Sequence, residues 1–156
     1  MSIPAEALYW LTSDGSLTAL LEAKAGQALK VEPTFEGYRV LTLAQKKQIG
    51  YQGAQLNRPV MAWVRESLLY GNSEKPWVAA QSIFPLVSLK GEAKRLQYLQ
   101  GTPIGYVLFK RQNSLPNRRV IDCTDSGWRR STFYNWHNRE LLISETFLAD
   151  FFIEGS

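Results

Sequence analysis

The stretch Trp63-Val64-Arg65-Glu66-Ser67-Leu68-Leu69-Tyr70 decides the fold that we expect for this chain. Aromatic, β-branched and aliphatic residues fill it, and the turn formers Gly71-Asn72-Ser73 end it, so it is predicted to be a strand. A second apolar run over 77–84 follows after a few turn residues, and such a short connection favours an antiparallel hairpin. A hairpin over residues 60–84 is therefore the predicted centre of the fold.

An arginine stands in the middle of this apolar strand. Side chains alternate between the two faces of a strand, so one face carries Met61, Trp63, Arg65, Ser67 and Leu69. A buried guanidinium is strongly unfavourable unless an anion meets it. Two interpretations follow: Arg65 is half of an internal ion pair, or it receives an acidic ligand.

The remaining chain divides into helical and extended segments. Helical spacing of apolar residues predicts helices over 5–11, 17–25 and 89–99. Ser16 and Thr102 are candidate N-caps for the second helix and for a further helix. Extended runs are predicted over 119–124, 128–136 and 141–148.

The segment between the second helix and the hairpin is less regular. Residues 28–41 suggest an interrupted strand, in which Pro33 indicates an edge or a bulge and Gly37 a turn. Residues 42–58 are interpreted as a connector with one helical turn. Hairpin-length connections without repeated crossover helices favour an α+β fold with an antiparallel sheet.

Composition limits the class of protein. The chain has 156 residues, 45% of them hydrophobic and 21% charged, which suits one globular domain spanning 1–156. The net charge is +4, but the basic doublets are dispersed along the chain, so most of them are expected on the solvated surface: Lys46-Lys47, Lys94-Arg95, Arg118-Arg119 and Arg129-Arg130. A nucleic-acid partner is therefore not expected, because its binder would cluster basic residues on one face.

Location follows from what the sequence lacks. Cys123 is the single cysteine, so no internal disulfide is possible. The N-terminus has no basic region followed by an apolar core, and no apolar run approaches the roughly 20 residues of a membrane helix. We expect a cytoplasmic protein without stable membrane insertion.

Few residues remain as chemical candidates. The lone His137 and lone cysteine cannot form a multi-histidine or zinc site. Glu145 lies in an apolar run and shares its face with Leu141, Ile143 and Phe147. Burial favours the neutral form of such a carboxyl group unless a cation pairs with it. Arg65 and Glu145 could therefore neutralise each other or serve a ligand, and spacing along the chain leaves both interpretations open.

Five blocks of sequence, in this order and spacing, resemble the chorismate pyruvate-lyase (4-hydroxybenzoate synthase) family. They are Ser16-Leu17-Thr18, the hairpin segment from Trp63 to Trp77, Gly101-Thr102-Pro103-Ile104-Gly105 with Leu108-Phe109, Trp128-Arg129-Arg130-Ser131, and Leu141 to Leu148. Each block is weak alone, and together they are specific. The chain departs from the family pattern at Tyr106, at Ala149-Asp150 and in the missing small residue after Trp128.

The resemblance implies a single antiparallel sheet of about six strands, with helices on one face and helical flaps over a buried ligand site. It implies a monomer that converts chorismate to 4-hydroxybenzoate and pyruvate, the first step of ubiquinone biosynthesis, without metal or organic cofactor. Arg65 and Glu145 would be the catalytic residues. Arg65 would bind the ring carboxylate with the backbone N–H groups of Leu17 and Ile104, while Glu145 would face the 4-hydroxyl group.

Several points stay open within this resemblance. Glu145 could orient the hydroxyl group, or act as general acid or base, or leave the proton transfer to the substrate itself. Arg129 or Arg130 could meet the pyruvyl carboxylate, and either could instead face outward. The alternative to an enzyme is a non-catalytic domain of the same fold that senses a small aromatic acid, as in the effector domains of some transcription regulators.

Overall fold

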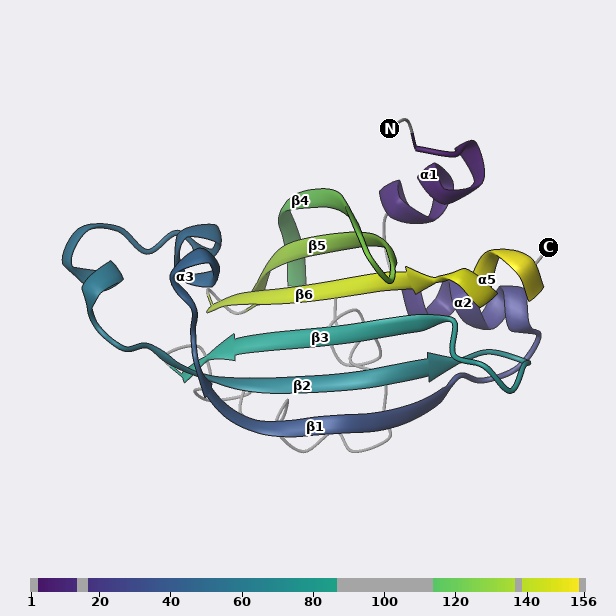
Figure 1. The fold of residues 1–156 in the computed structure, drawn as a ribbon, viewed down its shortest axis with the longest axis horizontal. Helices are drawn as coiled ribbons and strands as arrows, with labels where there is room; N and C mark the ends of the chain where they lie inside the picture. Colours follow the sequence, from purple (N-terminus) through teal and green to yellow (C-terminus); the bar gives the residue numbers. More distant parts are fainter. Residues whose placement is uncertain (1–2, 14–16, 87–113, 137–138, 155–156) are drawn as a thin grey trace.

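The computed structural model describes residues 3–13, 17–86, 114–136 and 139–154. In chain order the elements are α1 (Ala5–Thr12), α2 (Leu17–Ala25), β1 (Lys30–Val40), α3 (Leu43–Ile49), the 3-10 helix η1 (Gly53–Asn57), β2 (Met61–Tyr70), β3 (Val78–Pro85), β4 (Ser114–Thr124), β5 (Gly127–Trp136), β6 (Arg139–Leu148) and α5 (Ala149–Glu154). The strands form a six-stranded sheet in the order β1-β2-β3-β6-β5-β4 (Figure 1), and every pairing is antiparallel. The predicted α+β fold is confirmed.

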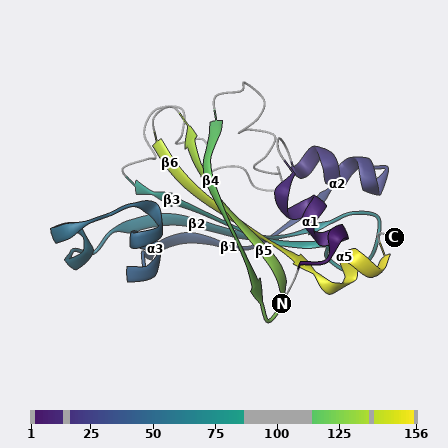
Figure 2. The ribbon, with the colours of Figure 1, turned by 90° about the horizontal axis from the view of Figure 1, so that it is seen from above.

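Strand register defines the two faces of the sheet. Arg65 of β2 lies opposite Ser82 of β3, and Ala80 of β3 lies opposite Glu145 of β6. Because side chains alternate, these four residues share one face, which we call the inner face; the opposite side is the outer face. Strands β4 and β5 cross β1–β3 at a steep angle, so the sheet is strongly twisted (Figure 2).

Helices α1, α2 and α5 gather at one end of the sheet, and α3 lies at the other end (Figure 1). The first three bury their apolar residues against the inner face, in a core built by Ala7, Trp10, Leu11, Leu17, Leu21, Ala25, Leu29, Leu69, Trp77, Val78, Phe147 and Phe151. The turn between β2 and β3 passes close to this core, because a Cβ at Gly71 would collide with the Trp77 ring. Phe151 of α5 belongs to this core, so the C-terminal helix is an integral part of the fold.

The segment interpreted as a connector contains a real helix, α3. Its N-cap Thr42 accepts from the Gln45 N–H, and the Gln45 side chain accepts from the Thr42 N–H, which forms a capping box. Lys46 is buried and donates from Nζ to the carbonyl oxygens of Leu56 at 2.7 Å and Arg58 at 3.0 Å. Helix α3 thereby covers part of the outer face, where Ile49 joins a core with Leu41, Ala62, Val64, Ile83, Phe133 and Leu142.

Most predicted boundaries agree with the structure. Gly26 ends α2 with φ +72°, and β1 is an edge strand whose register shifts between Pro33 and Phe35, so the edge and the bulge are both confirmed. The turn predicted at Gly37 is wrong, because Gly37 pairs with Val64 inside β1. The candidate N-caps and the predicted helix over 89–99 lie outside the described residues. None of the described helices combines the length and the apolar character needed to cross a membrane.

Candidate active site

Arg65 lies in the middle of the inner face with a residue exposure of only 3%. Burial lowers the pKa of its guanidinium, and the charge of Glu36 opposes that shift. Glu36 is opposite Arg65 on the edge strand β1 and is itself exposed, so it counters the loss of hydration only in part. A second negative charge on the inner face would therefore stabilise this cation.

Glu145 meets a different arginine from the one that the sequence suggested. Its Oε1 accepts a hydrogen bond from Nε of Arg130 at 2.8 Å, and the two residues lie opposite each other on β6 and β5. Arg65 stands two strands away across β3, with a Cα separation from Glu145 of roughly 12 Å from standard strand spacing. Arg65 and Glu145 therefore lie on the same face of the sheet, and the ion pair that the structure records for Glu145 is with Arg130 instead of Arg65.

Small side chains fill the space between them. Ser67 of β2 and Ala80 and Ser82 of β3 form the floor of the inner face between Arg65 and Glu145. The inner face carries six of the eight buried polar or charged residues among those described: Arg65, Ser67, Ser82, Arg130, Thr132 and Glu145. A few convergent polar groups on an otherwise apolar face are typical of a ligand site.

Further polar groups extend the site toward β4. Arg119 donates from Nε to Oγ1 of Thr132 at 2.8 Å. Burial lowers the pKa of Arg119, and the neighbouring Arg130 charge lowers it further, against the opposing effects of Tyr134 and Glu145. Burial also raises the pKa of Tyr134, and Glu145 adds to this shift while Arg130, Arg119 and a hydrogen bond with Thr132 oppose it. Tyr134 therefore keeps its proton at neutral pH and can act as a donor.

The predicted backbone donors are only partly described. Leu17 is the first residue of α2 and is buried, and the first N–H groups of a helix have no partner within the helix. An N–H group at a helix start is the kind of donor that the resemblance predicts, and the role of Leu17 stays a prediction. Ile104 lies outside the described residues.

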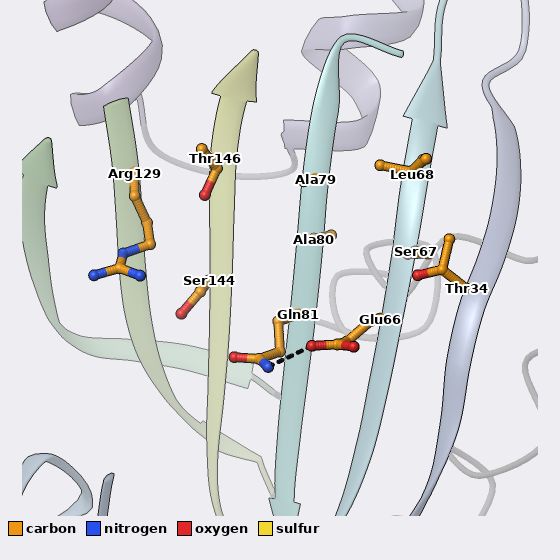
Figure 3. A pocket seen from close by; sticks show the side chains of 10 residues that line it. All are labelled: Thr34, Glu66, Ser67, Leu68, Ala79, Ala80, Gln81, Arg129, Ser144 and Thr146. Atoms are coloured by element: carbon orange, nitrogen blue, oxygen red, sulfur yellow. Dashed lines mark hydrogen bonds between the residues drawn. The ribbon is translucent and has the colours of Figure 1, made fainter. Parts of the chain in front are cut away.

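Arg129 belongs to the outer face. It forms a two-pronged ion pair with Asp122, with Nε donating to Oδ1 at 3.0 Å, and both side chains are partly exposed. Arg129 also borders a shallow hollow of about 250 Å³, on whose floor Gln81 donates to Glu66 at 2.8 Å (Figure 3). Arg130 therefore faces the inner site and Arg129 does not, while a role toward the pyruvyl carboxylate stays a prediction.

Sequence reasoning missed Arg119, Thr132 and Tyr134. Arg119 was included among dispersed surface doublets, although strand alternation places it on the same face as Ile121 and opposite Thr132. Strand alternation along β5 indicates which side chains lie together on the inner face: Trp128, Arg130, Thr132 and Tyr134. Among the described residues, His, Cys, Asp and Glu form no group of three or more suited to a metal ion.

Fold and site together define a class: small α+β proteins with a buried polar site on one face of an antiparallel sheet. A family model described as "Chorismate lyase" matches residues 1–154. Two similar relatives are each named "probable chorismate pyruvate-lyase". The protein of Psychrobacter arcticus is 66% identical over 94% of this chain and 87% of its own length, and that of Acinetobacter baylyi is 40% identical over 91% and 81%. The chain belongs to the chorismate lyase family.

A solved structure supports the fold independently. The effector domain of PhnF from Mycobacterium smegmatis superposes with a TM-score of 0.62, covering 87% of this chain and 90% of its own. Its sequence is only 11% identical, so the likeness concerns the fold alone.

Proposed function

We propose that this protein is a chorismate pyruvate-lyase that cleaves chorismate to 4-hydroxybenzoate and pyruvate. One observation carries the proposal beyond family membership: a buried arginine and a buried carboxylate share the inner face, with Ser67, Ala80 and Ser82 between them. An aromatic acid with a carboxylate at one end of its ring and a hydroxyl group at the other suits this arrangement. The proposed substrate site belongs to one chain, the single lyase domain 1–156, and requires no second copy.

Arg65 holds the ring carboxylate in this proposal. Its guanidinium can make two parallel, charge-assisted hydrogen bonds to a carboxylate, which fixes the direction of the ring as well as its position. The N–H of Leu17, at the positive end of α2, adds a further donor. Ile104 completes the set by resemblance to the family.

Glu145 faces the 4-hydroxyl end of the ring. The bond between C3 and the enolpyruvyl oxygen breaks, the C4 hydrogen passes to the enolpyruvyl methylene carbon, and the ring becomes aromatic while pyruvate leaves. The protein holds chorismate in the conformation in which the C4 hydrogen meets the methylene carbon. Such positioning can lower the reaction barrier by several kcal/mol. Glu145 orients the hydroxyl group for this transfer. By resemblance to the family, the proposal includes no metal or organic cofactor.

The direct test uses purified protein treated with a chelator and then given chorismate. Catalytic formation of 4-hydroxybenzoate, followed by absorbance and chromatography, is the expected result. No product, together with a raised melting temperature in 4-hydroxybenzoate, would favour the effector-sensing alternative, because any native-state ligand stabilises the fold. Light scattering in the same preparation should report a monomer near 17.7 kDa.

Replacing Glu145 with glutamine tests the second half of the site. The variant keeps the shape of the side chain and loses the charged acceptor, so turnover should fall roughly 10- to 100-fold, the equivalent of one hydrogen bond to a charged group. Glu66→Gln is the matched control, because Glu66 is an acid on the outer face. Equal turnover in the wild type and Glu145→Gln at every pH would remove Glu145 from the mechanism.

A further inference from the structure

Arg130 connects the site carboxylate to the end of helix α1. Its residue exposure is 1%, and its Nε donates to Oε1 of Glu145 at 2.8 Å. On its other side, Nη1 donates at 3.2 Å to the carbonyl oxygens of Trp10 and Ser13 and to the Ser13 hydroxyl group. A single guanidinium therefore holds two parts of the molecule that lie far apart in the sequence.

Arg119 holds the same helix end without binding the carboxylate. Its Nη1 donates to the carbonyl oxygens of Leu11 at 3.3 Å and Ser13 at 2.8 Å. The last carbonyl groups of a helix have no partner within it and carry the negative end of the helix dipole, so cations stabilise them. A helix cap alone would account for Arg119.

The cap does not account for the Nε contact of Arg130. Among the described residues, the hydrogen bond to Glu145 uses Oε1 and none is made to Oε2. The side chain of Glu145 keeps 12% exposure, against 1% for Arg130, so the accessible part of the pair is the carboxylate. The hydrogen bond therefore holds one oxygen of the carboxylate and leaves part of the Glu145 side chain accessible.

The charged groups around Glu145 come from several strands. Arg130 and Tyr134 belong to β5, Arg119 to β4 and Arg65 to β2, while α1 contributes carbonyl groups instead of charged side chains. Of these groups, Arg130 is the one whose hydrogen bond to Glu145 the structure records.

We propose that Arg130 is a positioning residue, which fixes the orientation of the Glu145 carboxylate and connects it to the end of α1. The inference rests on the proposed lyase function. Helix α1 ends at Thr12, and α2 begins at Leu17, the proposed backbone donor to the ring carboxylate. Arg130 therefore connects Glu145, at the hydroxyl end of the proposed site, to helix α1. In the chain, α1 precedes Leu17, which is proposed for the carboxylate end.

The test compares Arg130→Gln with Arg119→Gln, since both lose contacts to the end of α1 and only the first loses the contact to Glu145. Without this hydrogen bond the Glu145 carboxylate loses its fixed orientation, so turnover should suffer more than substrate binding. We expect kcat to fall at least tenfold in Arg130→Gln, with a smaller change in KM. Arg130→Lys keeps a charged donor and should recover part of the lost kcat, while Arg129→Gln, on the outer face, should keep the wild-type kcat. Arg119→Gln should lower kcat less than Arg130→Gln does, because its recorded hydrogen bonds go to Thr132 and to the end of α1.

A double substitution keeps the proposal testable if Arg130→Gln folds poorly. Combining Arg130→Gln with Glu145→Gln removes both buried charges at once, which avoids an unpaired one. If Arg130 acts through Glu145, the double variant should have the kcat of Glu145→Gln alone. A further multiplicative loss in the double variant, or a wild-type kcat in Arg130→Gln, would overturn the proposal. An inactive wild type in the same assay would instead count against the lyase function itself.

Discussion

Arg65→Ala is expected to lose nearly all turnover of chorismate while the sheet remains folded. Truncating one partner of a buried, hydrogen-bonded charge pair costs about 2–5 kcal/mol, which corresponds to a loss of roughly 30- to 5,000-fold in kcat/KM. The fold should tolerate the change, because burial already disfavours the charge of Arg65 and its neighbour Glu36 stays hydrated on the edge strand. Steady-state kinetics and thermal unfolding of the same preparation measure both effects.

Two variants separate the role of Arg65 from the loss of any positive charge. Arg39→Ala removes an exposed arginine, paired at 3.3 Å with Glu66, from the neighbouring strand and should keep wild-type kinetics. Arg65→Lys keeps the charge and loses the planar fork, so it should recover only part of the activity. Wild-type turnover in Arg65→Ala would show that the ring carboxylate is held elsewhere.

The sheet could be predicted because its signals are local. A strand alternates its side chains at every second residue, so Arg65 and Glu145 could each be assigned to an apolar face from their own segments. Pro33 similarly indicated an edge or bulge, since proline removes a donor from the strand ladder. Such properties depend on a few neighbouring residues and need no knowledge of the rest of the chain.

The partners of these residues depend on the order of the strands, which local patterns do not contain. Insertion of β3 between β2 and β6 separates Arg65 from Glu145, and the pairing of β5 with β6 brings Arg130 to Glu145. The basic doublet predicts a solvated Lys46. The side chain is buried instead, because its ammonium group donates hydrogen bonds to the carbonyl oxygens of Leu56 and Arg58. Long-range contacts of this kind decide which charge lies inside.

The C-terminal helix α5 contributes a side chain to the core. Phe151 is fully buried, and its ring contacts Trp10 of α1 at 4.9 Å, Phe147 of β6 at 5.3 Å and Trp77 at 5.4 Å between centroids. The Trp10 and Phe151 rings meet edge to face, the geometry that aromatic pairs favour. One side chain therefore joins the last helix to the first helix and to the sheet.

Phe151→Ala should accordingly lower the free energy of unfolding by about 3–5 kcal/mol, the usual cost of removing a buried phenylalanine. For a chain of this length, that loss corresponds to a fall in melting temperature of roughly 6–20 °C. Phe152→Ala is the control on the same helix, and its half-buried ring should cost less than half as much. Denaturant unfolding followed by circular dichroism measures both losses. Equal losses of stability in the two variants would mean that α5 does not insert Phe151 between α1 and the sheet.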